Sequence, residues 1–157
     1  MGAMFQNCTL LTQLDLSNWD TSKVYNMGSM FRSCSNLTSI TFGDNWNTSS
    51  VTTMQNMFYN CNNLTQLDLS KWDVGQVTTM SNMFYNCLAL TLLNSMKNIN
   101  TNLSLSDTKL DVNSLMSVID NLSTVTSDKT LTLGATNLGK LTEEQIAIAI
   151  NKGWSVA

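Results

Sequence analysis

Histidine and proline are absent from this 157-residue chain, and charged residues are scarce. Without histidine, the chain cannot build a Ser-His-Asp or Cys-His nucleophile arrangement or the usual zinc sites. Only 12% of the residues are charged, and 8 Lys and Arg stand against 11 Asp and Glu. So few cations do not give the electrostatic footprint of a nucleic-acid binder, and we therefore expect no nucleic-acid partner. No uninterrupted apolar run approaches the ~20 residues needed to span a bilayer, so we predict no membrane insertion.

The composition that remains is that of a folded protein with a neutral surface. Hydrophobic residues make up 43% of the chain, which suits a packed core. Asparagine, serine and threonine supply most of the polarity in place of charge. Such a surface makes neutral hydrogen bonds.

One pattern recurs four times along the chain. The strings MFQNC, MFRSC, MFYNC and MFYNC begin at Met4, Met30, Met57 and Met83, so their starting positions step by 26, 27 and 26. The extra residue in the second interval lies in FGDNW, where the other copies read LSNW and LSKW. Periods of this size are typical of solenoids, in which each unit buries its apolar side against the units stacked before and after it.

Two periodicities follow each other inside a unit. In the third unit, apolar residues first recur with helical spacing, and then Leu67 and Leu69 alternate with polar residues as in a half-buried strand. The residues with helical spacing are Val51, Met54, Met57, Phe58 and Cys61. The sequence therefore predicts an α/β solenoid, a right-handed stack of coils with a parallel sheet on one flank and short helices or turns on the other.

The chain divides into two regions by the regularity of this pattern. Residues 1–95 hold the four units of the repeat, of which the first is truncated because the chain opens in the middle of a unit. Repeat arrays need polar caps at their ends, so we expect further repeats on the N-terminal side. Residues 96–157 read as irregular repeats and a C-terminal cap with two helices.

The C-terminal region keeps the strand pattern and adds clearer helix signals. Asp111 is placed as an N-cap before a helical stripe formed by Leu115, Ile119 and Leu122. A capping box over residues 142–145 begins the last helix, in which we expect Ile146 and Ile150 to face inward before Gly153 ends it. Residues 154–157 read as a final strand. Further strand positions are Leu103 and Leu105, which Leu131 and Leu133 match in the following unit.

The four cysteines, Cys8, Cys34, Cys61 and Cys87, share the period of the Met-Phe pairs. A metal site needs ligands that converge on a point, whereas a stack places these residues in a line. Disulfides are disfavoured because side chains in register run parallel. We predict a reduced and buried cysteine ladder, and neither a metal nor a cofactor.

The outward positions of the strands are the predicted ligand-binding surface, a polar grid with rows about 4.8 Å apart. Asp15 and Asp68 lie two units apart, about 10 Å, which exceeds the ~6.5–9.5 Å of an inverting glycosidase pair. We therefore predict no enzymatic activity. The grid residues are Gln13, Asp15, Ser17, Ser39, Thr41, Gln66, Asp68 and Ser70.

Trp19, Trp46 and Trp72 follow the strands, one in each unit. Their rings either pack along the ridge of the stack, which we favour, or offer flat faces to a sugar ring or a protein partner. The Asp or Asn after each tryptophan is expected to cap the local turn through its side-chain oxygen.

The stretch NMFYNCNNLTQLDLSKWDVGQVTTM resembles the BspA-like leucine-rich repeat family of bacterial surface proteins, and the likeness covers about residues 1–93. The closing LTLGATNLGKLTEEQIAIAINKGW resembles the ends of such arrays, including those in phage tail or baseplate proteins. The resemblance implies a leucine-rich-repeat horseshoe with a role in adhesion or host recognition, and no catalysis. It also implies an extracellular location at a cell surface, or alternatively on a virion tail.

Three functional interpretations follow from the residues and the resemblance. The first is a non-enzymatic recognition module that binds a host protein or glycan through the exposed sheet face. The second is a phage tail fibre or baseplate component that contacts a bacterial receptor. The third is a structural spacer without a ligand.

Overall fold

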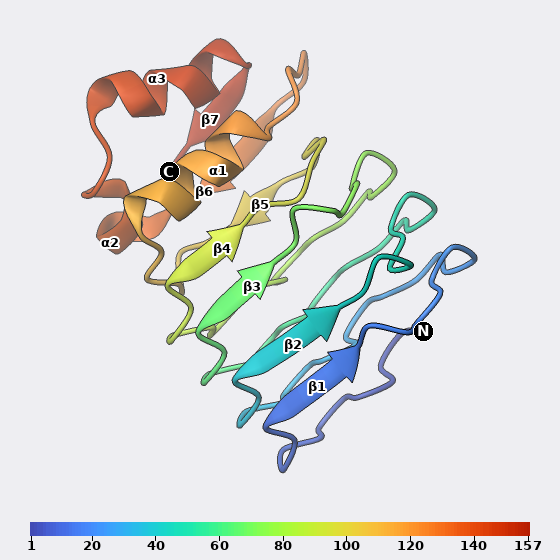
Figure 1. Ribbon diagram of the computed structural model, residues 1–157. Coiled ribbons are helices and arrows are strands. Elements are labelled where there is room, and N and C mark those ends of the chain that lie inside the picture. Colours follow the sequence, from blue (N-terminus) through green and yellow to red (C-terminus); the bar gives the residue numbers. More distant parts are fainter.

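The computed structural model describes residues 1–157 as a stack of chain segments, with the N-terminus at one end and the helices at the other (Figure 1). Four short strands come first along the chain, and Figure 1 shows them side by side in chain order. They are β1 (Gln13–Leu16), β2 (Ser39–Phe42), β3 (Gln66–Asp68) and β4 (Leu92–Asn94). The remaining elements are β5 (Leu103–Ser104), α1 (Val112–Asp120), β6 (Lys129–Thr132), α2 (Gly134–Leu138), α3 (Glu143–Asn151) and β7 (Trp154–Val156).

Equivalent positions of consecutive units pair in parallel. Gln13 pairs with Ser39 in the β1–β2 ladder, and Gln66 pairs with Leu92 in the β3–β4 ladder, each with the residue one unit further along the chain. The predicted alternation holds in the third unit, where Leu67 and Leu69 are buried while Asp68 between them is exposed. The inward leucines hold each strand on the core and leave the polar positions outside.

The expected continuous sheet is interrupted. The strands form three small parallel sheets, β1–β2, β3–β4 and β5–β6–β7, and no ladder joins β2 to β3 or β4 to β5. Helix α1 lies beside the free edge of β4, where the next strand of a continuous sheet would pair. The backbone N–H of Leu93 donates to Ser114 Oγ of this helix at 2.9 Å. The N–H of Ser95 likewise donates to Ser117 Oγ at 3.0 Å. Two serine hydroxyls of α1 thus accept the N–H groups of one residue in β4 and of the residue directly after this strand.

The other flank consists of consecutive turns, so of the short helices or turns expected there the turns form, and the helical spacing of residues 51–61 does not mark a helix. Asn56 and Asn60 adopt left-handed backbone conformations, with φ of 56° and 59°. Asparagine tolerates this conformation better than most residues. Alternate backbone N–H groups bond to the next unit, as Phe58 N–H does to the Met83 carbonyl at 2.9 Å. Those groups cannot then close i→i−4 helical bonds. Local turns closed by i→i−3 bonds, such as Cys61 N–H to the Phe58 carbonyl at 3.0 Å, produce the helix-like spacing of the apolar side chains.

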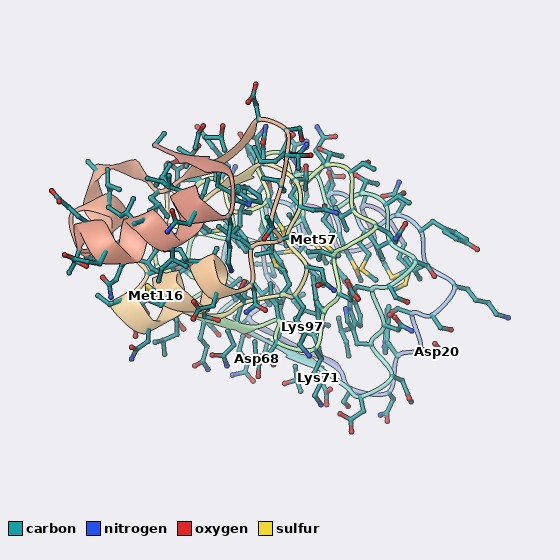
Figure 2. The ribbon with its side chains drawn as sticks, turned by 90° about the horizontal axis from the view of Figure 1, so that it is seen from above. Asp20, Met57, Asp68, Lys71, Lys97 and Met116 are labelled. Atoms are coloured by element: carbon teal, nitrogen blue, oxygen red, sulfur yellow. The ribbon has the colours of Figure 1, made fainter.

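The repeated apolar residues form one continuous core. Phe31 stacks on Phe5 at a ring-centroid distance of 5.7 Å and on Phe58 at 5.4 Å, and Phe58 stacks on Phe84 at 5.8 Å. Met57 lies within the stack (Figure 2) and is fully buried. The fixed interval of the sequence thus becomes a column of identical side chains in space.

The cysteines lie along the same column, with one exception. Cys34, Cys61 and Cys87 are buried, and each thiol donates to the carbonyl of a phenylalanine of the preceding unit at 3.0–3.1 Å. All four cysteines are free thiols. Cys8 is exposed, contrary to the expectation of a wholly buried ladder, because it lies on the uncovered outer face of the first unit. Met4 and Leu10 of that unit are exposed as well.

The C-terminal region contains the two expected helices and a third short one. Asp111 caps α1 by accepting from Ser114 N–H at 2.7 Å, and Thr142 forms the expected capping box with Gln145 at the start of α3. β5 and β6 pair through Leu103 and Leu131, as their matching positions in the sequence predict. The expectation for Ile150 is wrong, because this side chain is 55% exposed and Ala149 is buried in its place.

The short helix α2 has no counterpart among the elements expected from the sequence. It is too short for a periodic signal. It begins at Gly134, whose φ is +72°, and its Asn137 is fully buried. The amide Nδ2 of Asn137 donates to the Leu105 carbonyl at 2.9 Å. Helix α2 therefore packs against the preceding unit at the C-terminal end of the stack.

Candidate functional site

A concave surface crosses the exposed strand positions and ends at helix α1. Its volume is about 560 Å³. We call it the polar groove, and eight of its twelve lining residues are polar. The lining residues are Ser39, Ile40, Thr41, Gln66, Leu67, Asp68, Leu92, Leu93, Asn94, Asp111, Asn113 and Ser114.

Strands β2, β3 and β4 form the floor of the polar groove, and the first turn of α1 forms its end wall. The outward positions reach the floor because side chains alternate along a strand, so Gln66 and Asp68 face out while Leu67 between them is buried. The end wall is held in place by Ser114, whose hydroxyl accepts from Leu93 N–H of β4 and whose own N–H donates to Asp111 Oδ1. The groove is therefore preformed by backbone and buried side-chain contacts.

The structure brings together four of the eight predicted grid residues. Ser39, Thr41, Gln66 and Asp68 line the polar groove. The other four, Gln13, Asp15, Ser17 and Ser70, do not line it. Sequence reasoning missed Asn94 and Asn113. Asn94 could have been found, since it occupies the position of Asp68 in the next unit, whereas Asn113 reaches the groove only through the docking of α1.

Two carboxylates on the strands make the same local turn. Asp15 Oδ1 accepts from Ser17 N–H at 2.8 Å, and Asp68 Oδ1 accepts from Ser70 N–H at 3.0 Å. The bonds from Ser17 lower the pKa of Asp15. At Asp68 partial burial acts to raise the pKa, but bonds from Ser70 and Asn94 and the charge of Lys71 together lower it. Both side chains are therefore ionised acceptors at neutral pH.

A second hollow opens between β2 and β3 and shares three residues with the polar groove. We call it the strand cleft, and its volume is about 230 Å³. Figure 2 shows two of its residues, Asp68 and Lys71, on the strand side of the stack. The lining residues are Ile40, Thr41, Phe42, Gly43, Trp46, Asp68, Lys71 and Trp72.

The tryptophans are mostly packed. Trp46 is 3% exposed and Trp72 is 1% exposed, and their rings stack at a centroid distance of 5.9 Å. Trp19 in the first unit is partly exposed and packs on Phe5 at 5.9 Å. The residues after the tryptophans cap their turns as expected, with Asp20, Asn47 and Asp73 each accepting a backbone N–H two residues on at 2.9 Å.

The turn flank carries a different exposed surface. The rings of Tyr59 and Tyr85 stack at 4.8 Å, and the guanidinium of Arg32 lies 4.9 Å from the Tyr59 ring centroid. These three residues occupy the same position in consecutive units, which explains their column. Tyr25 is also exposed on the surface. This flank is therefore a second candidate interaction surface beside the polar groove.

No group of three or more Cys, Asp or Glu side chains is arranged to hold a metal ion. None of the helices has the length and apolar character that crossing a bilayer requires.

A family model described as "Mycoplasma protein of unknown function, DUF285" matches residues 1–121, which include all four units, β5 and α1. No curated protein and no solved structure matches the chain.

Proposed function

We propose that this chain, which belongs to the DUF285 family, is a non-enzymatic recognition module whose polar groove binds a host protein or glycan. We assign it to the BspA-like leucine-rich repeat proteins and to the α/β solenoid class. In this interpretation, it is displayed outside a bacterial cell. The parallel pairing of equivalent positions in consecutive units and the columns of Phe and Cys side chains support the fold assignment.

The observation that carries the functional proposal is the polar groove itself. Gln66, Asp68 and Asn94 stand on neighbouring strands, and Asn113 faces them from α1. Amide and carboxylate groups offer both donors and acceptors in fixed positions. Recognition by such a surface is spread over several units and needs little rearrangement of the protein.

The protonation of the carboxylates supports a role without catalysis. A glycosidase needs one carboxylic acid whose pKa is raised so that it can protonate the leaving group. Asp15 and Asp68 both have lowered pKa values, and of these two only Asp68 lines the polar groove, beside Asp111, whose pKa is lowered as well. The pair therefore lacks both the acid and the shared site that hydrolysis requires.

An array of glycans and host proteins, probed with the purified chain, tests the proposal. We expect capture of one ligand class by the wild-type chain and loss of capture by the double variant Gln66→Ala, Asn94→Ala. The melting temperature of the variant should stay close to that of the wild type, because substitutions of exposed strand side chains cost little stability. Capture that survives the double variant would place the site elsewhere.

The alternative is a phage tail fibre or baseplate component on a virion, which contacts a bacterial receptor through the same groove. The resemblance of residues 131–154 to the ends of arrays in such proteins favours it. Capture of bacterial surface glycans, with no host ligand on the array, would support this alternative. A structural spacer would capture nothing.

A further inference from the structure

The strand cleft exists because the second and third units separate on one flank only. On the turn flank they stay bonded, with Ser29 N–H donating to the Gln55 carbonyl at 2.8 Å and Phe31 N–H to the Met57 carbonyl at 3.0 Å. On the strand flank no backbone hydrogen bond joins β2 to β3. The backbone groups on the facing edges of these strands are therefore free to bind something else.

Two departures from the repeat explain the separation. Phe42 occupies the position that Leu16 and Leu69 hold in the neighbouring units, so a larger side chain enters the same space. The extra residue of the second unit follows it, in the segment Gly43-Asp44. The Phe42 ring lies 4.8 Å from Trp46 and 4.9 Å from Trp72, measured between centroids. The Phe42 ring thus packs against Trp46 of its own unit and Trp72 of the next unit, and it holds the two strands apart.

The dimensions of the strand cleft fit a small ligand group. Its volume of about 230 Å³ lies below the roughly 300–1,000 Å³ of pockets that hold drug-sized ligands. A single ring fits this size better than an extended segment. The cleft shares Ile40, Thr41 and Asp68 with the polar groove, so the two spaces are continuous. A chain-like ligand can therefore place one ring in the cleft and lie along the groove.

The lining of the strand cleft combines an apolar wall with hydrogen-bonding groups. Ile40 and Phe42 are partly exposed and supply the accessible apolar surface. Asp68 is an ionised acceptor, Thr41 both donates and accepts, and Lys71 donates. Trp46 lines the same wall, and its indole Nε1 is buried and has no acceptor in the protein. A ligand that suits these groups has an apolar ring face surrounded by hydroxyl groups.

The charges around the strand cleft disfavour an anionic ligand. Lys71, the one cation in the lining, forms an ion pair with the exposed Asp44. Asp68 adds a negative charge that this pair does not compensate. Asp44, Asp68 and Lys71 together carry one net negative charge, so an acidic sugar or a phosphorylated group would be repelled, whereas a neutral ring would not.

We propose that the strand cleft is an anchoring subsite for one neutral pyranose ring of a glycan, whose remaining residues lie along the polar groove. This proposal rests on the proposed function and narrows its ligand from a protein or glycan to a glycan.

Titration of the full chain with methyl glycosides of glucose, galactose, mannose and N-acetylglucosamine tests the subsite. The probe is the indole N–H signal of Trp46 in nitrogen-15 NMR spectra, assigned with Trp46→Phe. We expect one glycoside to move this signal in a saturable way. No movement with any of the four sugars would overturn the proposal.

The two matched aspartates provide the decisive comparison. Asp68→Asn should weaken sugar binding about tenfold or more, because a hydrogen bond to a charged acceptor is lost. Asp15→Asn changes the same turn in a unit outside the strand cleft and should leave binding within twofold. Asparagine preserves the turn at both positions. Equal weakening by both substitutions would overturn the assignment of the ligand to the strand cleft.

Phe42→Leu separates failure of the subsite from failure of the proposed function. It gives the second unit the leucine of its neighbours, so we expect a narrower cleft and loss of the sugar-induced shift. If an array ligand is still captured by Phe42→Leu but lost with Gln66→Ala and Asn94→Ala, the polar groove binds it and the subsite proposal is wrong. If a peptide moves the Trp46 signal and no sugar does, the cleft takes a protein ligand and the glycan assignment falls.

Discussion

Phe58 is fully buried between the stacked rings of Phe31 and Phe84. Phe58→Ala removes an aromatic side chain that the units on both sides contact, and a cavity remains because the backbone of the stack is held by inter-unit bonds. We expect the free energy of unfolding to fall by about 3–5 kcal/mol. Urea denaturation, followed by circular dichroism, measures the change.

Phe5→Ala is the matched control for this prediction. Phe5 holds the same position in the first unit but is partly exposed and stacks on only one phenylalanine, Phe31. The loss of stability should therefore be clearly smaller than for Phe58→Ala. Equal losses for the two variants would contradict the role of the preceding unit in burying the column.

The cysteines provide a second prediction at the residue scale. Cys8 is exposed, whereas Cys34, Cys61 and Cys87 are buried and bonded to carbonyls of the preceding unit. Because the exposed thiolate is the reactive species, one thiol per chain should react rapidly with Ellman's reagent under native conditions, and four should react in denaturant. Rapid native reaction of more than one thiol would contradict the buried ladder.

Burial of the thiols also predicts a dependence of stability on pH. Desolvation raises the pKa of Cys34 to about 11 and that of Cys87 to about 12, from an ordinary value of 9.0. It raises the pKa of Cys61 as well. The unfolded chain loses these protons first, so the contribution is complete below pH 9 and is lost as the pH rises through the folded-state values.

Urea midpoints measured between pH 8 and pH 11 check this expectation. The midpoint should decline above pH 9, and the decline should be shallower in the double variant Cys34→Ala, Cys87→Ala, which retains only one buried thiol. A wild-type midpoint that does not change across this range would contradict the prediction.

At the scale of elements, the strands could be predicted from the sequence, whereas the choice between short helices and turns on the other flank could not. Alternation around Leu67 and Leu69 indicates a strand wherever one side is buried, and β3 follows it. The spacing from Val51 to Cys61 fits a helix and a series of turns with i→i−3 bonds equally well. The choice depends on hydrogen bonds to the next unit, such as Phe58 N–H to the Met83 carbonyl, which periodicity alone does not reveal.

Helix caps, by contrast, are local and can be predicted from the sequence. Thr142 accepts from Gln145 N–H at 3.3 Å, and the Gln145 side chain accepts from Thr142 N–H at 2.9 Å. We expect Thr142→Ala to destabilise the protein by about 1 kcal/mol, whereas Thr142→Ser, which keeps the hydroxyl, should cost much less. Thermal unfolding of both variants measures the difference. Equal destabilisation would mean that the cap contributes through something other than its hydroxyl.

At the scale of the whole molecule, only part of the candidate site could be predicted. The repeat places Thr41, Gln66 and Asp68 on one face by counting alone. The end wall of the polar groove requires α1 to dock on β4 through the bond from Leu93 N–H to Ser114, a long-range contact that no periodicity indicates. The strand cleft results from one large side chain, Phe42, and one extra residue in the second unit. Both are visible in the sequence, but their effect on the spacing of the strands is visible only in the structure.

The most direct measurement of the central claim is the hydrogen-exchange footprint of a ligand captured on the array. The claim is that recognition takes place in the polar groove on the strand side. Bound ligand should protect residues 38–43, 64–69, 91–95 and 111–114 and leave the turn flank around Tyr59 and Tyr85 unchanged. Protection confined to the tyrosine column, with no change in the strands, would contradict it.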